Sequence, residues 1–269
     1  MSTLTIQNTD VHIDGEGEHT LLMIHGWPDT HRLWDPQVAY FKDTHRCVRF
    51  TVPGFDVNDT RAGHSLDSLM SFLNEVVDQV SSNQPVTLML HDWGCVLGYL
   101  FCQRHPDKVL KVVSVDVGDA TSSAFMRETT LPKKLMIISY QSTLALLWKL
   151  GTTRLGARCA DALTRRMAGL FQHPDKGHGV HSGMNYLYGV FVFGALGGKP
   201  KDLAVTVDRH PMFYAYATRK PFMFHSEHWL GVLKEHPSCD AQAFKSNHWV
   251  TVNQSDAFNQ CVDDWLRQV

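Results

Sequence analysis

Five short segments of this chain are rich in apolar residues that fall on both faces of a strand, and segments with helical periodicity separate most of them. They are residues 19–24, 46–51, 85–90, 109–115 and 212–217. A strand reads as a continuous apolar run when both faces of its sheet are covered, which is typical of parallel sheets. The alternation of such strands with helices therefore predicts an α/β fold with a mostly parallel sheet between helical layers.

The remaining elements follow from local signals. Residues 4–7 and 11–14 predict a short hairpin, and residues 240–245 predict a last strand. Ser65 precedes a run with apolar residues at helical spacing, so it is the expected N-cap of a helix. Further helices are predicted over residues 94–104, 227–235 and 255–268.

The strand–helix alternation breaks between residues 119 and 207. This stretch is helix-like and rich in Leu, Met and Arg. We interpret it as a helical cap of residues 119–207, inserted after the sixth strand into a core of residues 1–118 and 208–269. The 269 residues are enough for one such domain with its insertion.

Composition narrows the classes of function and partner. The formal charge is −2 with no basic block, so nucleic acid is not an expected partner. No apolar run of 18 residues occurs, and the N-terminus lacks a basic segment followed by an apolar one, so we expect neither a membrane partner nor a secretory signal. The six cysteines are scattered without a CxxC pair, which favours reduced thiols in a cytoplasmic protein and no metal site.

The segment around Asp92 is the strongest indication of chemistry. An apolar strand runs into His91-Asp92-Trp93-Gly94 and then into a predicted helix. This strand–turn–helix context is that of a nucleophile elbow, in which the residue at the tip is held above the sheet. A carboxylate at the tip can attack carbon and form a covalent ester. The alternative is that Asp92 only caps the helix.

Three motifs in this order resemble those of epoxide hydrolases, and the second is shared with haloalkane dehalogenases. They are His25-Gly26-Trp27-Pro28, His91-Asp92-Trp93-Gly94 and Asn247-His248-Trp249. The resemblance implies an α/β-hydrolase fold and a hydrolase that needs no cofactor. Two residues depart from the family pattern, because Leu90 and Cys95 stand where small residues or glycine are usual, so local strain or a shifted helix is expected at the elbow.

The resemblance also implies roles for individual residues. Asp92 is the nucleophile, and His248 activates the water that hydrolyses the ester. The backbone N–H groups of Trp27 and Trp93 would form the oxyanion hole.

A carboxylate that orients His248 completes such a triad. Most epoxide hydrolases carry it after the strand that follows the cap, but residues 218–221 here offer none. The other location used in the superfamily is the end of the strand after the nucleophile helix. Asp116 lies there, 24 positions after Asp92, so we predict Asp116 as the acid, with Asp119 as the second choice.

Epoxide opening also needs a proton donor for the leaving oxygen, and the family uses two cap tyrosines. The candidates here are Tyr140, Tyr186 and Tyr188, without a register that selects among them.

Three functions remain open at this stage. The first is an epoxide hydrolase acting on a small hydrophobic substrate. The second is a haloalkane dehalogenase in which the indoles of Trp93 and Trp148 bind halide; fluoroacetate chemistry is less favoured because Trp93 replaces an arginine. The third is a non-catalytic binding protein on a hydrolase fold. A homodimer is compatible with all three.

Overall fold

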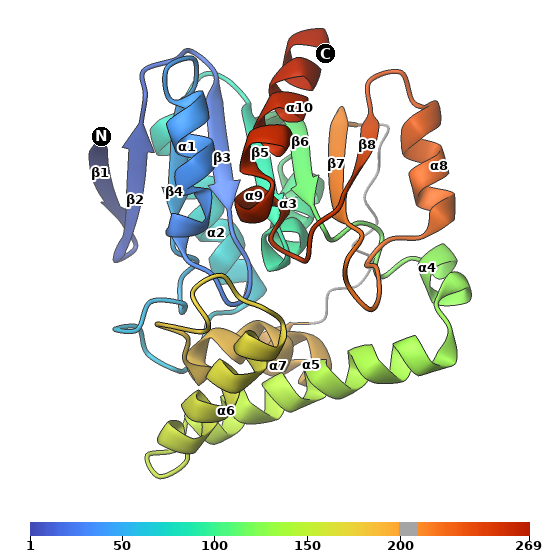
Figure 1. The fold of residues 1–269 in the computed structure, drawn as a ribbon. Coiled ribbons are helices and arrows are strands. Elements are labelled where there is room, and N and C mark those ends of the chain that lie inside the picture. The colour runs from blue at the N-terminus through green and yellow to red at the C-terminus, as the bar shows by residue number, and fades with distance from the viewer. Residues whose placement is uncertain (199–208) are drawn as a thin grey trace.

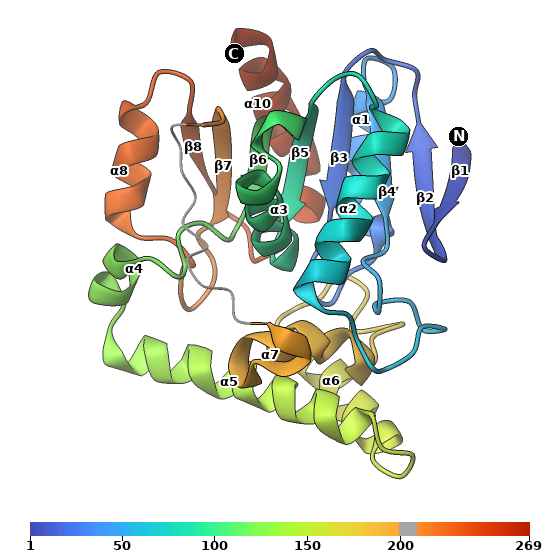
Figure 2. The ribbon, with the colours of Figure 1, turned by 180° about the vertical axis from the view of Figure 1, so that it is seen from behind.

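The computed structural model describes residues 1–198 and 209–269, and these form an eight-stranded sheet with helices on both faces (Figures 1 and 2). The strand order is β1-β2-β4-β3-β5-β6-β7-β8. β1 and β2 pair antiparallel, and β2 is also antiparallel to β4. The strands from β3 to β8 all run parallel to one another. The predicted α/β-hydrolase architecture is confirmed.

The strands lie close to their predicted positions. Their bounds are β1 Ser2–Ile6, β2 Thr9–Asp14, β3 Thr20–Ile24, β4 Arg46–Phe50, β5 Val86–His91, β6 Val109–Val115, β7 Met212–Ala217 and β8 Asp240–Phe244. Every residue of β3 and β5 is buried, as expected for strands that are covered on both faces.

The helices of the core cover the two faces of the sheet as two layers. On one face α2 (Leu66–Val80), α3 (Trp93–Arg104) and α8 (Glu227–Glu235) pack on the sheet, and on the other lie α1 (Asp35–Phe41), α9 (Val250–Asn253) and α10 (Ser255–Gln268). Ser65 caps α2 as predicted, accepting a hydrogen bond from the Ser68 amide.

Two helices of the core were not predicted, α1 and the four-residue α9. α1 has seven residues and is preceded by a short 3-10 turn, His31–Trp34. Its buried side consists of Gln37, Val38 and Phe41. A helix of two turns with a polar residue on its buried face has too short an apolar pattern to be distinguished from a loop in the sequence.

Four α-helices lie in the described residues between β6 and β7. They are α4 Ser123–Glu128, α5 Leu131–Gly151, α6 Ala157–Leu170 and α7 Tyr186–Phe193. Both views place α5, α6 and α7 beyond one end of the sheet, and we call residues 119–198 the cap (Figures 1 and 2). The predicted cap boundary at residue 207 lies outside the described residues. No helix in the described parts of the chain is long and apolar enough to cross a membrane.

Candidate active site

Asp92 occupies the turn between β5 and α3. Its backbone has φ 53° and ψ −120°, a conformation that non-glycine residues rarely adopt. The turn is closed from behind by Gly94, because a Cβ at that position would lie 2.0 Å from the Ile24 carbonyl oxygen. The start of α3 is thus pressed against the end of β3, and the strained turn presents the Asp92 carboxylate at the edge of the sheet.

The unusual Leu90 is accommodated by a glycine on the facing helix. Leu90 is fully buried, and a Cβ on Gly98 would come within 2.4 Å of its Cδ1 atom. The Cys95 thiol donates a hydrogen bond to the Val115 carbonyl at 3.4 Å. The helix therefore is not shifted away from the elbow: it begins directly after Asp92, with glycine offsetting the bulk of leucine.

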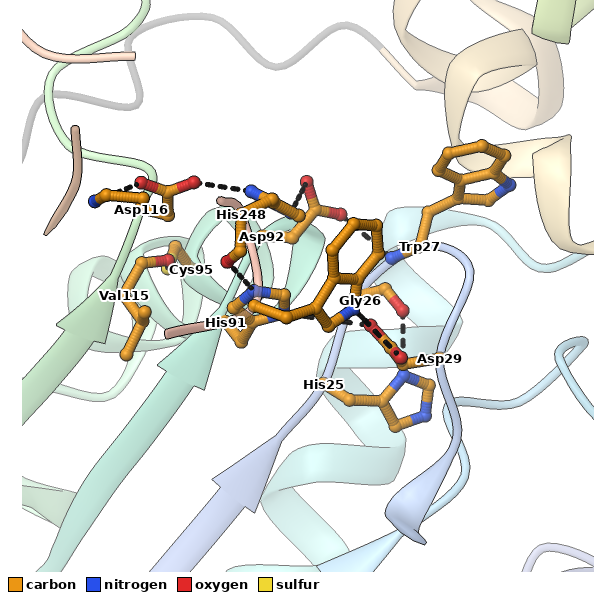
Figure 3. Close-up of polar contacts among 12 residues, drawn as sticks. His25, Gly26, Trp27, Asp29, His91, Asp92, Cys95, Val115, Asp116 and His248 are labelled. Carbon is orange, nitrogen blue, oxygen red and sulfur yellow. Dashed lines mark hydrogen bonds and ion pairs between the residues drawn. The ribbon is translucent and has the colours of Figure 1, made fainter. Parts of the chain in front are cut away.

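His248 lies between two carboxylates (Figure 3). Its Nε2 atom is 3.4 Å from Asp92 Oδ2, and its Nδ1 atom is 2.5 Å from Asp116 Oδ2. Burial alone would lower the pKa of His248, but hydrogen bonds to Asp116 and Asp92 and their charges raise it to about 9. The two carboxylates therefore favour the protonated imidazole at neutral pH.

Asp116 follows β6 and has a positive φ of 71°. Its Oδ1 atom accepts a hydrogen bond from the Ala217 amide at 3.0 Å and lies 2.6 Å from Lys220 Nζ. Burial tends to raise the pKa of Asp116, but the Lys220 charge and the His248 hydrogen bond outweigh it and bring the pKa to about 2. Lys220 follows β7, where most epoxide hydrolases are expected to carry their acid; here that position supplies a cation to the acid of β6.

No role for Lys220 was predicted from the sequence. The absence of a carboxylate after β7 indicated that Asp116 is the acid, but it did not show that the Lys220 side chain would turn toward Asp116.

Asp119, the second choice for the acid, is engaged elsewhere. Its carboxylate accepts hydrogen bonds from the Ser226 amide and hydroxyl, both at 2.7 Å, and from the Ser122 hydroxyl at 2.5 Å. Ser226 is the N-cap of α8. Asp119 therefore ties the start of the cap to α8 and does not contact His248.

The two predicted oxyanion donors lie next to Asp92. The Trp27 amide donates a hydrogen bond to Asp92 Oδ1 at 2.8 Å (Figure 3). A Cβ on Gly26 would lie 2.3 Å from the Trp93 amide nitrogen and 2.5 Å from Asp92 Oδ1, so both atoms pack against this glycine. Oδ1 is thus held by the backbone, whereas Oδ2 faces His248.

A layer of buried polar groups supports the loop that carries His248. His91 Nε2 is bonded to the His248 carbonyl oxygen at 3.0 Å. The Trp249 indole donates to Asp29 Oδ2 at 3.0 Å, and His173 Nε2 lies 3.2 Å from Asp29 Oδ1. These contacts hold the residues on both sides of His248, and neither His91 nor Asp29 was assigned a role from sequence.

Two cavities meet at Asp92. One, of about 230 Å³, extends toward His248 and Lys220, and the other, of about 380 Å³, extends beneath α5. Tyr140 and Tyr188 line both cavities together with Asp92. The third candidate, Tyr186, does not line them. Its hydroxyl donates to the Pro53 carbonyl at 2.8 Å, a contact that disfavours the predicted role of Tyr186 as a cap acid.

Both cavity tyrosines can donate a proton. Burial raises the pKa of Tyr140 and the pKa of Tyr188, and the Asp92 charge raises each further. The Tyr140 oxygen accepts a hydrogen bond from Gln141 Nε2 at 3.4 Å, and Tyr188 is hydrogen-bonded to the side chain of Trp93. An amide Nε2 and an indole N–H can only donate, so each phenol oxygen accepts in these contacts and its own proton is not used by them.

Comparison with known proteins agrees with this geometry. The α/β hydrolase fold family matches residues 19–141. Epoxide hydrolase 2 of Caenorhabditis elegans is 28% identical over 118 residues, which are 42% of this chain and 33% of that protein. The cis-3-alkyl-4-alkyloxetan-2-one decarboxylase of Shewanella oneidensis is 27% identical over 135 residues, 49% of this chain and 41% of that protein. These matches thus span less than half of each relative.

Solved structures resemble the whole chain. A mutant epoxide hydrolase from Bacillus megaterium, in complex with a diol product, has a TM-score of 0.71 at 16% identity and covers 99% of this chain and 100% of its own. Potato epoxide hydrolase I has a TM-score of 0.69 at 16% identity, covering 100% and 99%. At such identities the likeness shows the fold. The chain therefore has the α/β-hydrolase fold, and part of its sequence is similar to epoxide hydrolases.

Proposed function

We propose that this chain is an epoxide hydrolase that forms an ester on Asp92. The observation that carries the proposal is the junction of the two cavities, where the Asp92 carboxylate is faced by two phenols and backed by a histidine. A nucleophile, a proton donor for the leaving oxygen and a base for hydrolysis are the groups that epoxide opening requires.

In the first step Asp92 attacks an epoxide carbon. Oδ2 is the attacking atom, because Oδ1 is held by the Trp27 amide. The new C–O bond displaces the epoxide oxygen, which takes a proton from Tyr140 or Tyr188.

In the second step the ester is hydrolysed. Esterification removes the charge of Asp92, which is one of the groups that raise the pKa of His248. The pKa of His248 therefore falls in the intermediate, so the imidazolium gives up its proton, which returns to the tyrosinate left by ring opening. The neutral imidazole can then take a proton from water. The hydroxide attacks the ester carbonyl carbon, Trp27 donates to the oxyanion, and the diol leaves as the carboxylate reforms.

Haloalkane dehalogenation is the second candidate, because Asp116 after β6 is the acid position that favours it. Its halide would need free indole donors at the site. The two indoles predicted for this role are both engaged: that of Trp93 donates to the Tyr188 hydroxyl, and that of Trp148 donates to the Arg61 carbonyl at 2.9 Å. These engaged donors favour the epoxide.

The test is intact-mass spectrometry of His248→Gln after incubation with epoxides and haloalkanes. This variant should accumulate the ester, with a mass increase equal to the whole epoxide. An increase equal to the haloalkane minus halide would establish the second candidate.

The double variant Asp92→Asn/His248→Gln is the control and should gain no mass. The absence of an adduct with every compound of either class would favour a non-catalytic binding protein.

A further inference from the structure

Helix α5 is apolar on two sides, and only one side is covered. Leu144, Leu147 and Trp148 are buried against the rest of the cap. Leu131, Leu135, Ile138, Leu146 and Leu150 recur at helical spacing on another side and are 40% to 68% exposed. A helix that is apolar all round is normally buried all round. We call these five residues the outer stripe.

The outer stripe belongs to a larger apolar surface. Of 20 exposed large hydrophobic residues among those described, 13 lie between Met126 and Leu196, within the cap. Figures 1 and 2 both show α5 on the side of the cap that faces away from the sheet. Apolar exposure concentrated on one part of a molecule marks a contact surface, whereas scattered residues would not.

The same part of the chain is basic. Residues 119–198 hold nine Lys and Arg against four Asp and Glu, a net charge of +5, whereas the whole chain carries −2. None of these nine cations forms an ion pair with a described residue. Lys149 and Arg154 are exposed at the C-terminal end of the outer stripe, and Lys133 is exposed in the first turn of the same helix.

The larger cavity reaches this surface. Met126, Ile138 and Phe191 line the cavity that ends at Asp92, and their side chains are 49%, 57% and 36% exposed. The mouth of the cavity is therefore formed partly by residues of the exposed apolar surface.

We propose that the cap docks on an anionic lipid surface through the outer stripe, with the mouth of the larger cavity turned toward the lipid. Exposed apolar residues flanked by unpaired cations are the features of helices that lie in a membrane interface. A second copy is a poorer occupant, because a symmetric cap-to-cap contact would bring two surfaces of net charge +5 together. The sequence-based expectation of no membrane partner rested on the lack of a spanning segment, and surface binding requires none.

The test is co-sedimentation of the full chain with vesicles of phosphatidylcholine alone and of equal parts phosphatidylcholine and phosphatidylglycerol. We expect binding to the anionic vesicles that weakens as salt is added. Lys133→Gln/Lys149→Gln/Arg154→Gln should weaken it about a hundredfold, since each cation near such a surface is worth about fivefold. Leu131→Ser/Leu135→Ser/Leu146→Ser should weaken it at least about tenfold.

Two controls keep the result specific. Val57→Ser/Leu110→Ser/Val232→Ser removes exposed apolar residues outside the cap and should bind vesicles as the unaltered chain does. Asp92→Asn should also bind fully, so that failure of the proposed chemistry and failure of docking are told apart. Circular dichroism establishes that each variant is folded.

The proposal is overturned if the unaltered chain fails to bind anionic vesicles, or binds them equally after the outer-stripe substitutions. Sedimentation equilibrium then shows whether the surface is a dimer contact, in which case the outer-stripe variant is monomeric and the unaltered chain dimeric.

Discussion

The ends of the strands and the cap hold their reactive groups in different ways. Asp92 and Asp116 sit on strained turns with positive φ, and backbone amides bind both carboxylates. Tyr140 and Tyr188 sit on helices of the cap and are held by packing of their rings, whose centroids are 6.2 Å apart. The backbone at the edge of the sheet thus holds the two carboxylates in place, whereas side-chain packing in the cap holds the two phenols.

This difference has a physical reason. A buried carboxylate is costly unless it is bound by donors or a cation, and strand ends supply both at fixed positions. A neutral phenol needs only one partner and an apolar wall.

The largest expected effect comes from the acid at the end of β6. Asp116→Asn should lower kcat about 10⁴-fold, because the imidazole loses the carboxylate that orients it. Steady-state kinetics on any epoxide that is turned over would measure this.

Asp119→Asn is the matched control. It should lose about 1 kcal/mol of stability through weaker capping of α8 and keep most of its activity. The reverse ranking would make Asp119 the triad acid.

A smaller effect is expected from the cap. Tyr140→Phe and Tyr188→Phe should each slow ester formation about 10²-fold, because the leaving alkoxide loses one proton donor. Single-turnover measurements isolate this step. Tyr186→Phe should leave the rate of ester formation unchanged. If it slows this step as much as Tyr140→Phe and Tyr188→Phe do, Tyr186 also donates a proton in the reaction.

The rigidity of the elbow can be tested through stability. Gly98→Ala should lower the free energy of unfolding by about 1–3 kcal/mol, because the new methyl group overlaps Leu90. Gly231→Ala in α8, with no neighbouring atom within 4 Å, should be neutral or stabilising by about 0.5–1 kcal/mol. Urea denaturation compares them, and equal losses in both would exclude a tight Leu90–Gly98 contact.

The smallest effect concerns Lys220. Lys220→Met leaves the Asp116 charge without its cation, which favours imidazolium and raises the pKa of His248. Because hydrolysis of the ester needs neutral imidazole, its rate should reach half of its maximum about one pH unit higher. The pH dependence of ester decay measures the shift. Arg219→Gln, which also changes a residue of the cavity, is the control. If the pH profiles of Lys220→Met and Arg219→Gln coincide, Lys220 does not tune the pKa of His248.

Much of this protein could be predicted from local patterns in the sequence. Runs of buried strands separated by helices predicted the sheet, and the turn from an apolar strand into Asp92 and Gly94 predicted the elbow. These features depend on residues close together in the chain. The choice of Asp116 also followed from the sequence, because a strand end is a definite place along the chain.

Only the tertiary structure decided how distant side chains meet. It turned Lys220 toward Asp116, placed Gly98 opposite Leu90, and brought Tyr140 and Tyr188, but not Tyr186, to the cavities at Asp92. A helical pattern shows that one face is apolar, but not whether a tyrosine on it meets a cavity or a backbone carbonyl. That distinction depends on the packing angle of the cap helices, which no local pattern encodes.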